Sequence, residues 1–187
     1  AYISAAQLQM NQNDIDADPT VNVDCYDLVL SGSRFNLLEN KVVLVVPDGN
    51  PANINSFADI ENAELIAIGN SDVPVGSYSL EVLAYLGLDV SELESAGKIT
   101  YGSNVKEVTT QVAEGAVDCG IVYATDAYSA GLTVVDTATS DMCRQIIYPV
   151  AVLKDSNYPE EAAAFLEFLK TDPCVSVFEQ VGFSMAG

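Results

Sequence analysis

Short apolar runs alternate with segments of helical period along most of this chain. The runs rich in β-branched residues are Val42–Val46, Leu65–Ile68, Ile99–Tyr101, Gly120–Tyr123, Thr133–Val135 and Ile146–Leu153. Parallel strands need long crossover connections, which helices usually supply, so this alternation predicts an α/β fold with a largely parallel sheet. With 187 residues, 49% of them hydrophobic, the chain is long enough to form one or two compact lobes.

Several helices are indicated by their end signals. Ser56 with Asp59 resembles a capping box, and Asn104 with Glu107 is a second such pair. Gly115 is a predicted stop for the helix that follows Asn104. Two further helices are expected near the end of the chain: one from Pro159, with the apolar stripe Ala162, Phe165, Leu166 and Leu169, and one from Asp172-Pro173 to near Gly182.

The charge and the absence of histidine exclude several functions. Seven Lys and Arg against 27 Asp and Glu give a formal charge of −20, which argues against binding of nucleic acid or of an anionic membrane. Without histidine, the commonest general base and the commonest metal ligand are both missing. Paired acids such as Glu160 and Glu161 are expected on the solvent side of a helix. We therefore predict neither an enzyme, nor a metal site, nor a cofactor.

The four cysteines, Cys25, Cys119, Cys143 and Cys174, are far apart and include no C-x-x-C pair. This spacing does not fit a zinc ribbon or a thioredoxin-like motif. Two alternatives remain open for these cysteines: one or two disulfides, or four buried thiols.

Three segments place hydrogen-bond donors where predicted strands end, which is where open α/β sheets bind ligands. In the first, a helix start after Leu65–Ile68 offers the N–H groups of Val75, Gly76 and Ser77 to an anion, with Gly76 allowing close approach. An ordinary connection between a strand and a helix explains the same pattern.

The second segment, Gly102–Val108, follows the predicted strand Ile99–Tyr101, and the third, Gly120–Ala127, begins with the predicted strand Gly120–Tyr123. If the side chain of Asn104 caps its own helix, the N–H of Val105 is left for a ligand, although Asn104 alone indicates only a cap. Tyr123 ends the run Gly120–Tyr123, where a phenol can donate a hydrogen bond to an oxyanion without adding charge. A tyrosine half-buried in the core is the alternative.

Seven segments of the chain resemble segments of periplasmic molybdate-binding proteins, and they occur in the same order as in that family. They are Ile3–Met10, Asn40–Pro47, Val73–Tyr78, Asn104–Val108, Gly120–Ala127, Tyr148–Val152 and Phe178–Phe183. The resemblance implies the type II periplasmic binding protein fold, with lobe 1 built from residues 1–46 and 149–187 and lobe 2 from 47–148. Hinges are then expected near Pro47 and Pro149, with the ligand between the lobes.

The resemblance also implies a function and a ligand set. Molybdate or tungstate would be held by the N–H groups of Val75 and Val105 and by the phenol of Tyr123, where Val75 departs from the usual alanine. The partners would be the membrane permease and the ATPase of an ABC importer, and the location would be extracytoplasmic, periplasmic or lipid-anchored. The family's first-lobe serines lie upstream of Ala1, and Ala1–Ala5 reads as the end of a strand. We therefore expect a first lobe incomplete at its N-terminus, weaker binding and self-association.

Two other functions stay open at this point. One is an oxyanion-sensing effector domain of a transcription regulator, although no DNA-binding segment is seen in the chain. The other is a receptor for a different tetrahedral oxyanion, such as sulfate.

Overall fold

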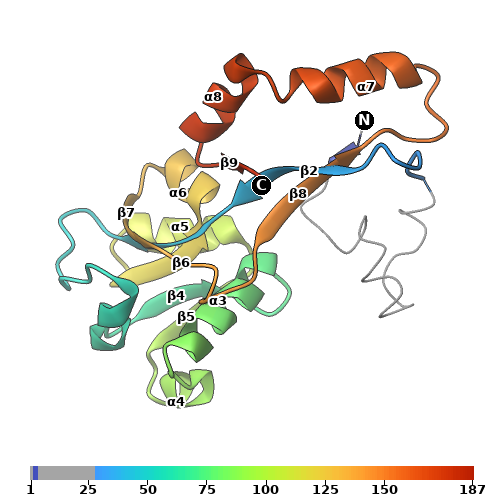
Figure 1. The fold of residues 1–187 in the computed structure, drawn as a ribbon. Coiled ribbons are helices and arrows are strands. Elements are labelled where there is room, and N and C mark those ends of the chain that lie inside the picture. Colours follow the sequence, from blue (N-terminus) through green and yellow to red (C-terminus); the bar gives the residue numbers. More distant parts are fainter. Residues whose placement is uncertain (1, 4–27) are drawn as a thin grey trace. The chain divides into compact units, whose positions relative to one another are not determined.

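The computed structural model describes residues 2–3 and 28–187, and these form two compact units (Figure 1). Unit 1 combines the chain up to Asn40 with Ile146–Gly187, and unit 2 is Lys41–Gln145. We predicted lobe boundaries at 46/47 and 148/149, so both observed boundaries come earlier in the sequence. The difference concerns mainly Val42–Val46, which pairs with strands of unit 2 rather than unit 1. An apolar run followed by proline does not reveal which sheet it joins.

Unit 1 is an antiparallel sheet combined with two helices. Its elements are β1 (Tyr2–Ile3), β2 (Phe35–Asn40), β8 (Ile146–Ala151), α7 (Pro159–Phe168), α8 (Asp172–Gln180) and β9 (Ser184–Met185). The strand order is β1-β8-β2-β9, with every pair antiparallel. Leu166 and Leu169 of the α7 region pack with Leu37 and Val150 of the sheet. The helix starts at Pro159 and Asp172 are confirmed, but Phe165 of the predicted stripe is 48% exposed.

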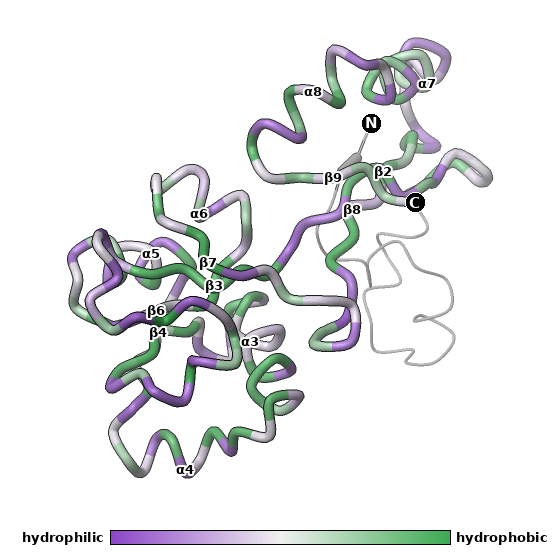
Figure 2. Tube along the Cα trace, turned by 60° about the vertical axis from the view of Figure 1, so that its left-hand side comes forward, coloured by the Kyte–Doolittle hydropathy of each residue, from purple (hydrophilic) through white to green (hydrophobic). Residues whose placement is uncertain are grey.

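Unit 2 is a mixed sheet with helices on both faces. Its elements are β3 (Val42–Val46), the 3-10 helix η2 (Phe57–Asn62), β4 (Ile66–Gly69), α3 (Pro74–Tyr85), α4 (Val90–Ser95), β5 (Ile99–Gly102), α5 (Val105–Ala113), β6 (Cys119–Tyr123), α6 (Ala124–Ala130) and β7 (Thr133–Thr137). The strand order is β5-β4-β6-β3-β7. Hydrophobic residues run along its central strands, and hydrophilic ones predominate in many of its connections (Figure 2).

The prediction of a largely parallel sheet is wrong in part. Only β5, β4 and β6 are parallel to one another, whereas β3 pairs antiparallel with β6 and β7, and unit 1 has no parallel pair among its described strands. Alternating strands and helices predict parallel pairing only where each connection returns the chain to the same end of the sheet. The connection from β3 to β4 does not, because β3 is antiparallel to β6 and β6 is parallel to β4. Here β3 lies beside β6 and β7, which come much later in the sequence.

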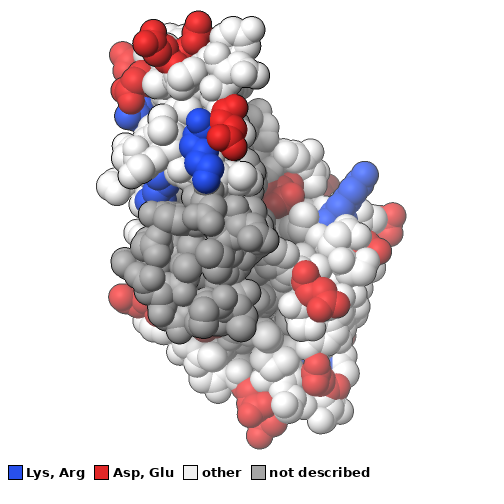
Figure 3. Space-filling view, turned by 90° about the vertical axis from the view of Figure 1, so that its right-hand side faces the viewer, with Lys and Arg blue, Asp and Glu red and all other residues white. Residues whose placement is uncertain are grey.

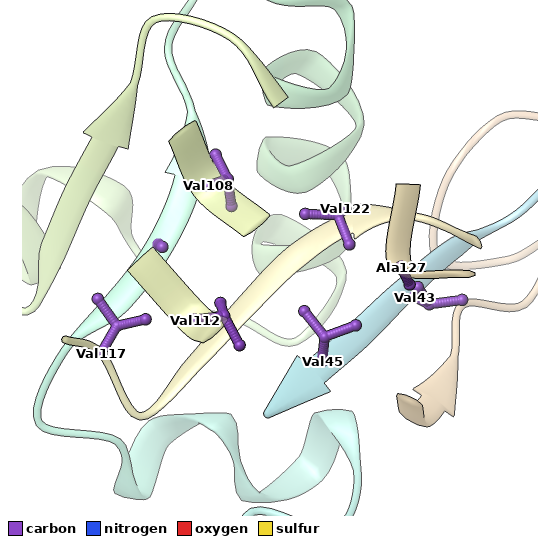
Figure 4. Close-up of a cluster of buried hydrophobic side chains, with 8 residues drawn as sticks. Val43, Val45, Val108, Val112, Val117, Val122 and Ala127 are labelled. Atoms are coloured by element: carbon purple, nitrogen blue, oxygen red, sulfur yellow. The ribbon is translucent and has the colours of Figure 1, made fainter. Parts of the chain in front are cut away.

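One core cluster of unit 2 lies between the sheet and helices α5 and α6. Val108 and Val112 of α5 and Ala127 of α6 pack against strand residues that include Val45 and Val122 (Figure 4). Helix α3 contributes none of these residues, although its own Val82 and Leu83 are fully buried. Since α3 contacts the same strands, it covers the opposite face of the sheet. The helices that follow the neighbouring strands β4 and β5 therefore lie on opposite faces.

The described surface is acidic, as the composition predicts. On the face drawn in Figure 3, acidic side chains recur across the visible surface, with basic side chains scattered among them. Among the described residues, none of the helices has the length and apolar character needed to cross a membrane.

Candidate functional site

The candidate site is the edge of the unit 2 sheet where the three parallel strands end. Gly69 of β4 pairs with Gly102 of β5, and Ala67 pairs with Gly120 of β6. Continuing this register places Tyr123 about one residue beyond the end of β4. The three predicted segments therefore start from neighbouring strands at one edge. Because α3 and α5 leave that edge toward opposite faces, it is the topological switch point at which such sheets bind ligands.

Val75 lies in the first turn of α3, next to the end of β4. It is fully buried, and Pro74 before it has no N–H group. The N–H of Gly76 already donates to the carbonyl of Val73 at 2.8 Å. In a helix with Val73 at the N-cap, the N–H of Ser77 is the first that an α-helical bond engages. Of the three donors that we predicted here, Val75 is thus the one whose N–H group has no acceptor within the helix.

Gly76 has a packing role that differs from the predicted one. A Cβ atom at this position would lie 2.2 Å from the carbonyl oxygen of Asn70 and 2.5 Å from that of Gly69. The absence of a side chain thus allows the start of α3 to contact the end of β4. We predicted that Gly76 gives a ligand access to the backbone, and the structure assigns that space to the protein's own carbonyl groups.

Asn104 caps α5, as predicted. Its side chain accepts the N–H of Glu107 at 3.0 Å, and the carboxylate of Glu107 accepts the N–H of Ser103 at 2.6 Å. The pairing resembles a capping box shifted by one residue, because the glutamate bonds to the residue before the N-cap. The first N–H groups of α5, starting with Val105, have no acceptor within the helix. Gly115 follows the end of α5 with φ 66°, which confirms the predicted stop.

Tyr123 is the last residue of β6 and the N-cap of α6, and its side chain is half-buried. Its ring meets that of Tyr78 on α3 edge to face, with the centroids 6.1 Å apart. This aromatic contact joins the end of β6 to the second turn of α3. The phenol is therefore held at the same edge as the start of α3, from which Val75 comes.

Three of the four basic residues of unit 2 lie at this edge. Unit 2 has four of them: Lys41, Lys98, Lys106 and Arg144. The carbonyl of Lys41 accepts the N–H of Ala124 at 2.9 Å, Lys106 is in the first turn of α5, and the guanidinium of Arg144 lies over the Tyr78 ring. Lys98, by contrast, precedes β5 at the opposite end of the strand.

Acidic groups also lie near the edge, so its charge is mixed. Glu81 forms an ion pair with Arg144 at 2.9 Å, and Glu107 caps α5. Asp126 is in the first turn of α6, where burial raises the pKa of its carboxyl group above the ordinary value. A groove lined by Asn70, Leu80 and Tyr101 among others adjoins the end of β4, but it includes none of the three predicted ligand-binding residues.

The described cysteines and acids do not form a metal site or a disulfide. Cys119, Cys143 and Cys174 are free thiols, and Cys25 lies outside the described residues. Within residues 2–3 and 28–187, no group of three or more Cys, Asp and Glu side chains is placed to hold a metal ion.

The chain resembles bacterial solute-binding proteins over nearly its whole length. It is 39% identical over 164 residues to YvgL of Bacillus subtilis (strain 168), provisionally named an ABC transporter substrate-binding lipoprotein. It is 29% identical over 163 residues to the molybdate-binding protein ModA of Escherichia coli (strain K12). These matches cover 87% and 83% of this chain, and the chain spans 62% of the length of each relative.

A solved structure and a family model agree with these relatives. A Clostridium difficile structure, provisionally described as the substrate-binding domain of a molybdenum ABC transporter, matches with a TM-score of 0.80 and 28% identity, covering 99% of this chain and 76% of that one. It confirms the predicted α/β periplasmic binding protein fold. The model of the bacterial extracellular solute-binding proteins matches residues 9–184. The chain therefore belongs to the family of bacterial extracellular solute-binding proteins, which bind solutes and are not enzymes.

Proposed function

We propose that this chain binds molybdate or tungstate outside the cytoplasm, for delivery to the permease and ATPase of an ABC importer. The observation that carries the proposal is the arrangement of Val75, Val105 and Tyr123 at the ends of three neighbouring parallel strands. The similarity to a molybdate-binding protein supports the choice of oxyanion.

The chemistry of the edge suits a tetrahedral oxyanion. Two main-chain N–H groups at helix starts carry the partial positive charge of the helix dipole, and a phenol adds a neutral donor. Hydrogen bonds to a charged partner each contribute about 1.5–3 kcal/mol. Three such donors can therefore replace part of the hydration shell of the anion, and the spacing between them sets the size of anion that fits.

Amide NMR tests the proposal because it observes the main-chain donors directly. The 187-residue chain is titrated with molybdate while its amide signals are recorded. The amide signals of Val75 and Val105 should shift on binding. The amides of Gly76 and Glu107 are matched controls, because both already donate within the protein and should shift less. Sulfate and phosphate are titrated in parallel. Unchanged amides at millimolar molybdate would contradict the proposal, and an equal response to sulfate would favour a receptor for another oxyanion.

A further inference from the structure

Arg144 places a positive charge beside the aromatic pair of the candidate site. Its guanidinium carbon lies 4.7 Å from the centroid of the Tyr78 ring, and Tyr78 in turn contacts the ring of Tyr123. The cation is thus separated from the phenol of the proposed site by a single aromatic ring. The Arg144 side chain is 61% exposed, so a solute can reach it.

Glu81 fixes Arg144 in this position through two contacts. One carboxylate oxygen of Glu81 lies 2.9 Å from Nη1 of Arg144, and the other accepts the main-chain N–H of Arg144 at 2.9 Å. Partial burial opposes the charge of the guanidinium, but the Tyr78 phenol and the Glu81 carboxylate outweigh it and raise the pKa of Arg144 above its ordinary value. A guanidinium has five N–H donors, and that of Arg144 contacts Glu81 through Nη1 and is also hydrogen-bonded to Tyr78.

We propose that Arg144 is a specificity-determining residue that makes the site prefer doubly charged over singly charged tetrahedral oxyanions. This inference rests on the proposed function and deepens it. Main-chain N–H groups and a phenol are neutral, so they recognise mainly the shape and the acceptor atoms of the anion. The attraction of a full cation grows in proportion to the charge of the anion, and therefore separates two anions of the same size.

The experiment compares tungstate with perrhenate, two tetrahedral oxyanions of nearly equal size that carry two charges and one charge. Affinities for both are measured by calorimetry for the wild-type chain and for Arg144→Gln, Arg144→Lys and Lys98→Gln. Arg144→Gln removes the cation and leaves Glu81 uncompensated, so the ratio of tungstate to perrhenate affinity should fall about tenfold. Arg144→Lys keeps the charge and should keep most of the ratio.

Lys98→Gln is the matched control. It changes the net charge by the same amount, but at the amino end of β5, where the Lys98 side chain donates to the carbonyl of Glu61. The ratio for this variant should equal that of the wild type. Thermal unfolding of each variant establishes that it is folded before its affinities are compared.

The outcomes separate this inference from the proposed function. If wild-type protein binds tungstate but Arg144→Gln leaves the ratio unchanged, Arg144 does not set the charge preference. The inference is also overturned if Arg144→Lys lowers the ratio as far as Arg144→Gln, or if Lys98→Gln lowers it equally. A wild-type chain that binds neither anion at millimolar concentration would overturn the proposed function itself.

Discussion

Gly69 and Gly102 are register partners at the carboxyl ends of the parallel strands β4 and β5. A Cβ atom on Gly69 would lie 3.0 Å from the main-chain nitrogen of Gly76, and one on Gly102 would lie 2.9 Å from the carbonyl oxygen of Asn104. Each glycine thus lets the following helix start close to its strand. The pair brings the two helix starts, with the N–H groups of Val75 and Val105, to the same edge.

Val105→Pro should weaken oxyanion binding without unfolding α5. Val105 is the first residue of the helix, the position where proline is best tolerated, and Asn104 before it is extended with φ −158° and ψ 164°. The substitution removes one N–H donor, and a charge-assisted bond of about 1.5–3 kcal/mol corresponds to a loss of affinity of roughly tenfold or more. Calorimetry with molybdate measures the change.

Val105→Ala is the control for this prediction, since it shortens the side chain and keeps the N–H group. It should bind molybdate within about twofold of the wild type, because a main-chain donor does not depend on the side chain. Equal affinities of Val105→Pro and Val105→Ala would show that this N–H group does not contact the anion.

Tyr123→Phe should reduce affinity for molybdate by roughly tenfold, the value expected for one hydrogen bond to a charged group. The substitution removes the phenol oxygen and keeps the ring that contacts Tyr78. Tyr128→Phe is the matched control, because Tyr128 belongs to the adjacent helix α6 and is 52% exposed. Calorimetry on both variants tests the assignment, which fails if they bind molybdate equally well.

The strands and helices of unit 2 were largely predictable from the sequence because each carries a local signal. The run Val42–Val46 is all β-branched or leucine, and Asn104 with Glu107 is a start signal that acts within one helical turn. Strand Phe35–Asn40 was missed. Its sequence FNLLEN mixes apolar and polar residues, and its strand character comes from pairing with β8, more than a hundred residues away in the sequence.

The placement of the three candidate ligand-binding residues in the fold was predictable from the sequence, but their surroundings were not. Val75 and Val105 come shortly after recognisable strands and Tyr123 ends one, so the sequence indicates that the three residues share one edge of the sheet. The placement of Arg144 is different, because it depends on Glu81 and Tyr78 of α3, and no spacing rule connects residues so far apart in the sequence. The role of Gly76 was also hidden, since a glycine needed for packing and one needed for ligand access look alike in a sequence.

Gly76→Ala should destabilise the protein by about 3 kcal/mol, near the upper end of overpacking costs. The new Cβ would lie 2.2 Å from the carbonyl oxygen of Asn70, and main-chain atoms of a strand end cannot move aside easily. Gly115→Ala is the comparison, because Gly115 has φ 66° and open space around it, so only backbone strain of about 1–2 kcal/mol is expected. Urea unfolding measures both free energies, and equal values would refute the packing role of Gly76.

Cys119 should make the protein less stable as the pH rises above 9. Burial, with a smaller contribution from the neighbouring carboxylate of Asp118, raises the pKa of the Cys119 thiol from 9.0 to about 12. Between these values the unfolded chain releases a proton that the folded protein retains. Stability due to this thiol is thus fully present below pH 9 and falls by at most about 1.4 kcal/mol per pH unit on the way to pH 12.

The Cys119→Ala variant isolates this contribution from the other groups that titrate in alkali. Urea unfolding of wild type and variant between pH 8 and pH 11 gives two curves of unfolding free energy. The variant loses buried contacts and should start lower, but its curve should fall less steeply above pH 9, so that the difference between the two proteins shrinks as the pH rises. Curves that stay parallel across this range would mean that the folded thiol ionises as readily as the unfolded one, and that Cys119 is not held neutral by its burial.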